Sequence, residues 1–370
     1  MTCHKELKTI VSICGDPGGA NALAPVVRDL SQKAIFYLKN YTYAQGSSIF
    51  QKQNLSTTPL SCDVHLETAH SALEETKPDL LLTATSHNTQ NWEKKFILSA
   101  RNLGIPSVSI LDFWSNYSLR FSDERGALSC LPDAIIIMDE QAKSEMIAEG
   151  FPEDRLLVMG QPAFDSLPRS KSAFTENKKL ELRHDLGVSS NEKLVVFVSQ
   201  PLRQVLNGKT TLGFDEHEVL RDLIFALEPL SEQSPISLLI RPHPREEVSD
   251  YDKYHSDRIP IQVSNDGESH SLYLSADLVV GMNSVALVEA CHLDCHVLSY
   301  QPGLVARDSL PTNRSGLSHA VYAKENLLPK LASLLSAPRP VNSSRFCSAA
   351  SEKIVKYLSS QFAGPILGLI

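Results

Sequence analysis

Residues 277–300, DLVVGMNSVALVEACHLDCHVLSY, contain a complete strand–helix–strand unit. The apolar run over 277–282 predicts a strand, the following segment predicts a helix, and 295–300 predicts a second strand. Two parallel strands need a crossover connection, and that connection is usually a helix. The stretch therefore predicts a parallel βαβ unit and an α/β fold.

The same alternation of strands and helices continues in both directions along the chain. In the first half, predicted strands lie at 9–14, 33–38, 63–68, 79–86, 106–114 and 133–139. In the second half, they lie at 194–199, 236–242, 259–264, 277–282 and 295–300. Strands such as DLLLT and DAIIIMD are almost continuously apolar, which is typical of sheets that helices cover on both faces. We therefore expect two tandem Rossmann-like domains.

The domain boundary is expected where the composition changes. A chain of 370 residues is long for a single domain. From residue 165 to 192 the sequence is polar, charged and rich in serine, with one predicted helix at 178–186. We expect two Rossmann-like domains with a cleft between them, followed by C-terminal helices. The expected boundaries are a first domain at 1–165, a linker at 166–192, a second domain at 193–340, and at 341–370 a C-terminal helix that packs back on the body.

The composition limits the classes of function. The net charge is −8, whereas nucleic-acid binders normally carry an excess of basic residues, so we expect no nucleic-acid partner. No run of 18 apolar residues predicts a transmembrane helix, and no signal peptide is recognisable. We expect a cytoplasmic protein. The apolar tail FAGPILGLI (362–370) either docks on the body or contacts the inner face of a membrane peripherally.

The seven cysteines do not form a regular pattern. Cys291 and Cys295 stand four residues apart, with His292 between them and His296 after them, and this spacing could suggest a metal site. A zinc site of this kind needs a second pair of ligands, and none follows. We therefore expect free, buried thiols, no metal site and no bound cofactor.

Polar residues that directly follow apolar strands are the candidate site residues, because doubly wound sheets bind ligands at the carboxyl ends of their strands. In the first half, the loop GDPGGAN (15–21) exposes backbone N–H groups at a helix start, which favours anions. Asp16 could accept a proton from a hydroxyl, or it could only cap the turn. Further candidates in this half are Gly18, Gly19, Asn21, Thr85, Ser86, His87, Asp112, Trp114, Asn116, Tyr117 and Arg120. The two aromatic residues could stack on a sugar, or their loop could be a packed inter-domain segment.

The second half has three polar strand ends in successive βα units. These candidates are Ser199, Gln200 and Pro201 after the first strand, Arg241 and His243 after the second, and Asn283 and Ser284 after a later one. Asn283 or Ser284 can cap the helix that begins there, and a hydroxyl beside a free helix N-terminus suits a phosphate. Glu289 lies further along the same apolar helix, so it needs a bonding partner, either a ribose hydroxyl or a neighbouring loop.

Two tandem Rossmann-like domains with C-terminal helices resemble the GT-B glycosyltransferase superfamily. The stretch ADLVVGMNSVALVEA resembles the phosphate-binding unit of that superfamily, which includes UDP-GlcNAc 2-epimerase. More specifically, Gln200–Pro201, His243–Pro244 and Ser284 are similar to motifs of bacterial transferases that use CMP-activated Kdo or sialic acid. The sequence departs from these families at GDPGG, which has one acid where several have an acidic pair, and at NS, where they have SS.

The resemblance implies a metal-independent glycosyltransferase with an N-terminal acceptor domain and a C-terminal nucleotide-sugar domain. His243 and Ser284 would contact the donor phosphate, Gln200 would line the nucleotide pocket, and Asp16 would be the catalytic base. The donor would be a CMP-sugar, and the acceptor a glycan, glycolipid or protein. Alternatives are a UDP-sugar transferase, a UDP-GlcNAc 2-epimerase-like enzyme, a CDP-polyol phosphotransferase and a non-catalytic solute binder. The acceptor, the stereochemical course and the oligomeric state stay open.

Overall fold

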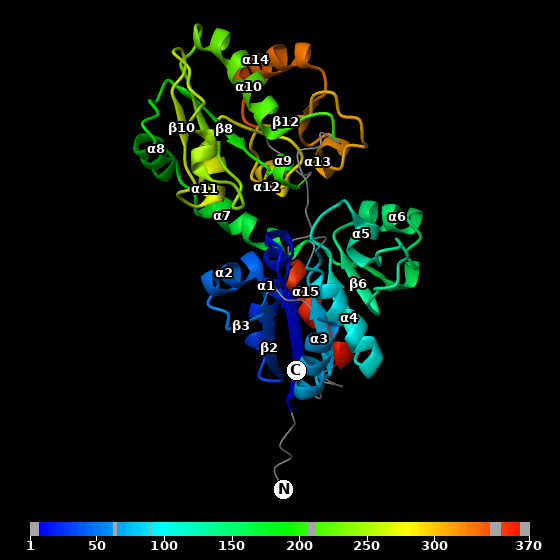
Figure 1. The fold of residues 1–370 in the computed structure, drawn as a ribbon. Helices are drawn as coiled ribbons and strands as arrows, with labels where there is room; N and C mark the ends of the chain where they lie inside the picture. Colours follow the sequence, from blue (N-terminus) through cyan, green and yellow to red (C-terminus); the bar gives the residue numbers. More distant parts are fainter. Residues whose placement is uncertain are drawn as a thin grey trace. The chain divides into compact units, whose positions relative to one another are not determined.

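The chain forms two compact units. The computed structural model describes residues 7–61, 65–86, 88, 90–205, 212–340 and 349–362. One unit comprises residues 1–165 with 345–370, and the other comprises residues 166–344. Each is built on a parallel sheet, of seven described strands in the first unit and six in the second, with helices on both faces (Figure 1). The doubly wound α/β architecture predicted from the sequence is confirmed.

The first sheet has the strand order β3-β2-β1-β4-β5-β6-β7, and every described neighbouring pair is parallel. Its strands are β1 (Lys8–Cys14), β2 (Phe36–Thr42), β3 (Thr58–Pro59), β4 (Leu80–Thr83), β5 (Ser107–Ile110), β6 (Ala134–Ile137) and β7 (Leu156–Val158). All four residues of β4, β5 and β6 are buried. This burial on both faces explains why these strands have no alternation of polar and apolar residues.

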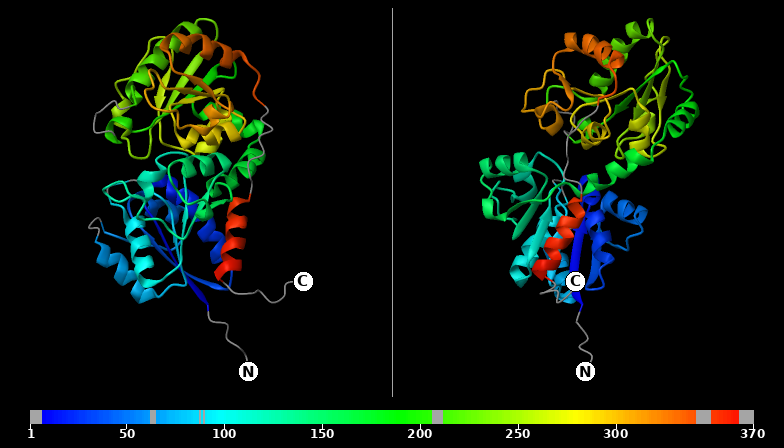
Figure 2. Two further views of the ribbon diagram at one scale, coloured as in Figure 1. Left: turned by 90° about the vertical axis from the view of Figure 1, so that its right-hand side faces the viewer. Right: turned by 180° about the vertical axis from the view of Figure 1, so that it is seen from behind.

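The helices of the first unit connect the strands and close the unit at its C-terminal end. They are α1 (Pro17–Ser31), α2 (Ala44–Lys52), α3 (Leu66–Thr76), α4 (Trp92–Leu103), α5 (Tyr117–Phe121), α6 (Glu140–Ala148), the 3-10 turns η1 (Glu153–Arg155) and η2 (Pro162–Ser166), and α15 (Ala350–Phe362). The last helix, red in Figure 2, packs on α1. Its residues Ile354, Val355 and Leu358 join the apolar core of this unit.

One predicted strand of the first unit is wrong. The segment 63–68 is predicted as a strand, but α3 begins at Leu66, and residues 63 and 64 lie outside the described part of the chain. Ala69 and Leu73, one helical turn apart, are the buried residues of α3, so the helical period outweighs the short alternating pattern. Helix α2 was not predicted from the sequence.

The second sheet has the order β10-β9-β8-β11-β12-β13 and is also parallel throughout its described pairs. Its strands are β8 (Lys193–Val198), β9 (Ile236–Arg241), β10 (Ile261–Val263), β11 (Leu278–Gly281), β12 (Val297–Tyr300) and β13 (His319–Val321). Its helices are α7 (Leu167–Ala173), α8 (Glu176–Asp185), α9 (Leu202–Val205), α10 (Glu216–Ser231), α11 (Ser269–Ser275), α12 (Val285–His292), α13 (Pro311–Arg314) and α14 (Leu327–Ser336), with the 3-10 turns η3 (Val248–Tyr251) and η4 (Lys324–Asn326).

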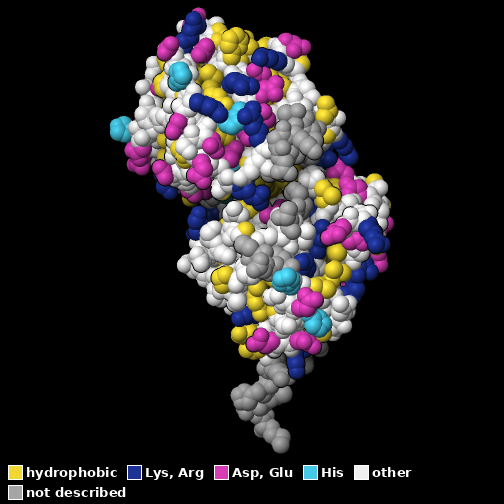
Figure 3. Space-filling model, in the orientation of Figure 1, with side chains coloured by type: hydrophobic (Ala, Val, Ile, Leu, Met, Phe, Trp, Pro, Cys, Tyr) yellow, Lys and Arg dark blue, Asp and Glu magenta, His cyan; other side chains and the backbone are white. Residues whose placement is uncertain are grey.

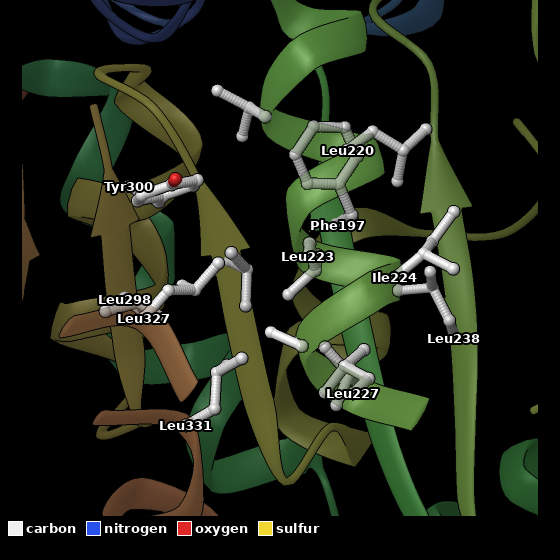
Figure 4. Packing of buried hydrophobic residues seen from close by; sticks show 14 of the residues in the cluster. Phe197, Leu220, Leu223, Ile224, Leu227, Leu238, Leu298, Tyr300, Leu327 and Leu331 are labelled. Atoms are coloured by element: carbon white, nitrogen blue, oxygen red, sulfur yellow. The ribbon is translucent and has the colours of Figure 1, made fainter. Parts of the chain in front are cut away.

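The core of the second unit is centred on α10. Leu220, Leu223, Ile224 and Leu227 recur at the helical period and point toward the strands that carry Phe197 and Leu238 (Figure 4). Complete burial of one such leucine stabilises the fold by about 2 kcal/mol. This packing fixes the strand ends of the unit relative to one another.

Residues 166–192, which the sequence predicts as a linker, contain two helices of the second unit. Both α7 and α8 pack against α11. The buried Arg183 of α8 donates to the carbonyl oxygen of Ser275 at 3.0 Å and forms an ion pair with Asp277 at 3.0 Å. The polar composition of this segment therefore reflects helices on the surface of the unit.

Candidate functional site

In each unit, the order of the strands places the carboxyl ends of three strands side by side at one edge of the sheet. In the first sheet, β1 lies between β2 and β4, and in the second, β8 lies between β9 and β11. Each arrangement is the point at which a doubly wound sheet reverses its winding, where ligands bind in such folds. In each unit, we therefore expect a ligand at this edge of the unit's own sheet.

His243 follows β9 and has a defined protonation pattern. Its Nδ1 accepts a hydrogen bond from the backbone N–H of Arg245 at 3.1 Å, so the neutral imidazole carries its proton on Nε2. Burial and the nearby Arg245 lower the pKa of His243 to about 4. At neutral pH the side chain is therefore an uncharged N–H donor.

The turn that carries His243 is held by Glu246. The carboxylate of Glu246 accepts hydrogen bonds from the backbone N–H of His243 at 2.7 Å, from the Tyr251 hydroxyl at 2.7 Å and from the Ser199 hydroxyl at 3.1 Å. Burial raises the pKa of Glu246. The hydroxyl of Ser199 therefore links the end of β8 to the turn that carries His243. Pro201, two residues after Ser199, is buried.

Arg241, the other predicted site residue after β9, makes hydrogen bonds to the backbone of a neighbouring loop. Its guanidinium donates to the carbonyl oxygens of Ser264 at 3.3 Å, of Asp266 and of Gly267 at 3.0 Å. These bonds hold the loop that follows β10. Arg241 therefore shapes this edge of the sheet through main-chain contacts.

The start of α12 contains a buried hydroxyl that lacks a hydrogen-bond partner. The side-chain oxygen of Gln200 accepts a hydrogen bond from the backbone N–H of Asn283 at 2.8 Å. The side-chain amide of Asn283 donates a hydrogen bond to the Ser309 hydroxyl at 3.2 Å. Ser284 is the N-cap of α12, yet its hydroxyl makes no capping bond and has no partner in the described structure. Leaving a buried polar group unpaired costs about 1–3 kcal/mol, which marks this position as a candidate anion contact.

Glu289 lies further along α12 and faces a residue that was not predicted from the sequence. Burial raises the pKa of Glu289 to about 7. Its Oε2 is 3.9 Å from Nε2 of His270, at the start of α11. His270 follows no strand directly, so it lacks the signal that identified the other candidates.

In the first unit, the glycine-rich loop allows α1 to approach the neighbouring strand ends. A Cβ atom on Gly18 would lie 2.4 Å from Oδ2 of Asp112, and one on Gly19 would lie 2.7 Å from the carbonyl oxygen of Thr85. Asp112 also accepts hydrogen bonds from the Thr85 hydroxyl and from Arg120, both at 2.6 Å. Asn21 is exposed on α1.

Asp16 belongs to a hydrogen-bond network that was not predicted from the sequence. The amide of Asn88 donates to Oδ1 of Asp16 at 3.0 Å and to the Tyr43 hydroxyl at 2.9 Å. Tyr43 in turn donates to Glu93 at 2.6 Å, and the predicted candidate Ser86 donates to the same carboxylate oxygen at 2.7 Å.

Glu93 is the buried end of this network. Its side chain lies on α4, the residue is 3% exposed, and Oε1 has no hydrogen-bond partner in the described structure. Burial raises its pKa to about 7, although the bonds from Tyr43 and Ser86 lower it. Residues with such perturbed pKa values cluster at functional sites.

The aromatic candidates of the first unit serve packing. Trp114 is 2% exposed, donates to Asp139 at 2.7 Å and stacks on Phe164. Tyr117 is buried and donates to Glu145 at 2.7 Å. Both residues therefore match the packed-loop alternative. Asn116 is exposed with a left-handed backbone at the N-cap of α5, and His87 lies outside the described residues.

The cysteines agree with the expectation of free, buried thiols. Cys14, Cys130, Cys291 and Cys295 are free and buried, whereas Cys3, Cys62 and Cys347 lie outside the described residues. No group of three His, Cys, Asp or Glu residues in the described part of the chain could hold a metal ion.

No described helix has the length and apolar character needed to cross a membrane. On the face shown in Figure 3, acidic and basic side chains are interspersed.

Comparisons with known structures extend over nearly the whole chain. The structure matches UDP-GlcNAc 2-epimerase from Neisseria meningitidis bound to UDP-GlcNAc with a TM-score of 0.72, at 17% identity, over 95% of this chain and 99% of that one. The chain has the GT-B fold. It also matches the glycotransferase of kitacinnamycin, with a TM-score of 0.63 at 14% identity over 96% and 100% of the two chains. MurG from Acinetobacter baumannii matches with a TM-score of 0.58 at 12% identity over 96% and 99%.

No protein-family model and no curated protein sequence matches the chain. At these levels of identity, the structural matches establish the fold alone. The resemblance to the GT-B superfamily is therefore confirmed at the level of fold. None of the three matched structures is described as an enzyme of CMP-sugars, so the more specific resemblance stays a prediction from the sequence.

Proposed function

We propose that the protein is an enzyme that acts on a nucleotide sugar and that its second unit binds the nucleotide. The observation that carries this proposal is the buried hydroxyl of Ser284, which has no partner among the described residues at the start of α12. The backbone N–H groups at the start of a helix favour anions, and a phosphate oxygen would accept a hydrogen bond from the unpaired Ser284 hydroxyl.

Two further residues of the second unit support a nucleotide as the ligand. His243 lies after β9 and Ser284 after β11, on either side of β8 at one edge of the sheet. The Nε2–H group of neutral His243 is a second hydrogen-bond donor for a phosphate oxygen. Because the imidazole is uncharged, it avoids the desolvation cost of a buried charge. Glu289 provides a carboxyl group on the same helix as Ser284, where a ribose hydroxyl could bond it.

The first unit supplies groups for acid–base chemistry. Asp16 and Asp112 follow β1 and β5, and Glu93 lies on the helix after β4. Asp112 is paired with Arg120, whereas the pKa of Glu93 is raised to about 7, so the two carboxyl groups have different environments. Carboxyl groups in different environments can act as separate acid and base.

A UDP-sugar is the preferred substrate in this proposal. The match with the highest TM-score among those given above is an epimerase with UDP-GlcNAc bound. Epimerisation of a sugar carbon needs more than one acid–base group, and the three carboxyl groups of the first unit meet that need. Glycosyl transfer is the second candidate, because the glycotransferase and MurG also share the fold. The predicted CMP-sugar donor is the alternative that the binding experiment must separate.

Isothermal titration of the whole protein with UDP, CMP, GDP and TDP tests the nucleotide. We expect UDP to bind most tightly, and His243→Ala and Ser284→Ala to weaken binding. Binding of CMP alone would replace the UDP proposal with the donor implied by the sequence resemblance. If no nucleotide binds, the nucleotide-sugar proposal is wrong and a non-catalytic solute binder becomes the better explanation.

The reaction is tested by incubating the protein with UDP-GlcNAc and recording ¹H NMR spectra. Appearance of the C2 epimer supports epimerase chemistry. Release of UDP only when a sugar acceptor is present supports transfer. If UDP binds but neither change occurs over hours, the UDP-GlcNAc assignment is overturned, and other UDP-sugars remain to be compared by the same measurement.

A further inference from the structure

A groove on the surface of the second unit lies between helix α10 and residues 253–255. Its volume is about 530 Å³, which is within the usual range of small-molecule sites. One wall is a stripe of α10 that carries His217, Arg221, Phe225 and Glu228, spaced about one helical turn apart. The leucines of α10 that fill the core of the unit lie beside this stripe and point toward the strands (Figure 4).

Side-chain contacts join the two walls of the groove at two places along α10. Near the start of the helix, the ring of His217 stacks on the ring of Tyr254, and its Nδ1 is 2.7 Å from the tyrosine hydroxyl. Nearer the end of the helix, the Ser256 hydroxyl donates a hydrogen bond to Glu228 at 2.6 Å. These contacts hold the walls in place. They also give Glu228, the acidic residue that lines the groove, a hydrogen-bond partner of its own.

Three cationic side chains line the same groove. Arg203 is paired with Asp215 at 2.8 Å. Arg221 and Lys253 form no hydrogen bond or ion pair with any described residue, and the Lys253 ammonium lies 5.4 Å from the centre of the Tyr254 ring. Burial raises the pKa of Tyr254 to about 12, although Arg221 and Arg203 lower it, so both guanidinium groups act on this ring. Two cations of the groove therefore have hydrogen-bond donors that an anion can use.

Aromatic rings lie beside these cations. The side chain of Phe225 is 73% exposed, so a ligand can cover most of its ring. Burial, together with Lys253 and Arg203, lowers the pKa of His217, and its imidazole is therefore uncharged at pH 7. Uncharged rings next to cations suit a ligand that combines a planar apolar ring with an anionic group. A nucleic acid fits less well, because its affinity depends on many phosphate contacts and the net charge of the protein is −8.

We propose that this groove is a second ligand site, which binds a small aromatic anion that bears a phosphate or carboxylate group. Arg221 and Lys253 hold the anionic group, and Phe225 packs against the planar ring. This inference goes beyond the proposed function and does not depend on it, because neither His243 nor Ser284 lines the groove.

The test uses 1-naphthyl phosphate and 1-naphthoate as probes, with inorganic phosphate and 1-naphthol as ligands that lack one of the two parts. Isothermal titration of the whole protein, with and without saturating UDP, measures the affinity for each. We expect at least one naphthyl anion to bind more tightly than inorganic phosphate and 1-naphthol, and to do so equally well when UDP is present.

Two substitutions locate the probe in the groove. Arg221→Ala and Lys253→Ala should each weaken its binding about tenfold, because each removes a charged hydrogen-bond donor. Both side chains are exposed, so both variants should fold like the wild type, which circular dichroism checks. Arg258→Ala is the matched control and should keep the affinity, because Arg258 is an exposed cation of the same unit that does not line the groove.

The remaining outcomes contradict the inference. Displacement of the naphthyl anions by UDP would place them in the nucleotide site. Equal affinity for inorganic phosphate would show that the rings contribute nothing and that the ligand class is wrong. The second site is also wrong if neither naphthyl anion binds at millimolar concentration, or if both groove variants keep the affinity of the wild type. If UDP itself does not bind, the proposed function fails, and the two variants still decide the groove.

Discussion

The carboxylate of Glu246 accepts the backbone N–H of His243 at 2.7 Å. The same carboxylate binds the hydroxyls of Ser199 and Tyr251, so one buried side chain ties the end of β8 to the turn after β9. His243 therefore owes its position to a residue three places further along the chain. The two prolines that flank the histidine restrict the backbone, but Glu246 supplies the hydrogen bonds.

Glu246→Ala should disorder this turn and weaken nucleotide binding. The substitution leaves a backbone N–H and two hydroxyls without their acceptor, which should lower the free energy of unfolding by about 1–3 kcal/mol. Urea denaturation measures this change, and titration with UDP measures the loss of affinity. Glu232→Ala, which removes an exposed ion pair with Arg258, should change stability by less than about 1 kcal/mol. Equal effects of the two substitutions would contradict the role of Glu246.

Ser284→Ala should separate ligand binding from stability. The hydroxyl has no partner in the described structure of the free protein, so its removal should leave the melting temperature unchanged or raise it. Nucleotide affinity should fall about tenfold, which corresponds to about 1.4 kcal/mol. Thermal unfolding with and without UDP measures both effects. A large loss of stability without ligand would show that the hydroxyl caps α12 after all.

The fold was largely predictable because continuous apolar runs determine the strands of a covered parallel sheet. The strands at 9–14, 79–86 and 133–139 all appear, and Gly104 ends α4 with the left-handed backbone expected of a C-terminal glycine. The short strand β13, of three residues, has too little apolar pattern to be recognised. The predicted strand at 63–68 was wrong because an apolar residue at every second place over so short a stretch also fits a helix face.

The candidate site was harder to predict, because side-chain partners come from distant parts of the chain. The position of His243 at a strand end follows from the local pattern, but its neutral state depends on burial and on Arg245. Tyr43 comes from the segment after β2, whereas Asn88 and Glu93 come from the segment after β4, and the strand order brings these two segments together. Trp114 carries the same local signal as a ligand-stacking aromatic, and only its packing against Phe164 identifies it as core.

The raised pKa of Glu93 should make stability depend on pH. The pKa is raised from 4.5 to about 7 in the folded protein. Below about pH 4.5 the carboxyl is neutral in both folded and unfolded chains, so it imposes no penalty. As the pH rises toward 7, the unfolded chain releases the proton while the folded chain keeps it, and the folded state loses stability. The loss at high pH should be about 3 kcal/mol.

Glu93→Gln removes this titration. Relative to the wild type, the variant should therefore become more stable as the pH is raised from 5 to 8. Urea denaturation at each pH measures the difference in unfolding free energy between the two proteins. Glu67→Gln, an exposed glutamate at the start of α3, is the control and should give a difference that does not vary with pH. A flat difference for Glu93→Gln would mean that its carboxyl titrates normally in the folded protein.

Tyr43→Phe should reveal that the tyrosine and Glu93 act as one unit. The tyrosine hydroxyl donates to Glu93 at 2.6 Å and accepts from Asn88 at 2.9 Å, so its removal leaves Glu93 with Ser86 as its described donor. In the wild type, the hydrogen bond from Tyr43 lowers the pKa of Glu93. Without this bond, the pKa of Glu93 should rise further, and the loss of stability should occur at higher pH.

A double-mutant cycle of Tyr43→Phe with Glu93→Gln should show a coupling energy of about 0.5–3 kcal/mol, because the two groups are in direct contact. Tyr37→Phe, which removes an exposed hydroxyl from the same β2 region, should show no coupling with Glu93→Gln. Additive effects of Tyr43→Phe and Glu93→Gln would mean that the hydroxyl and the carboxyl contribute independently.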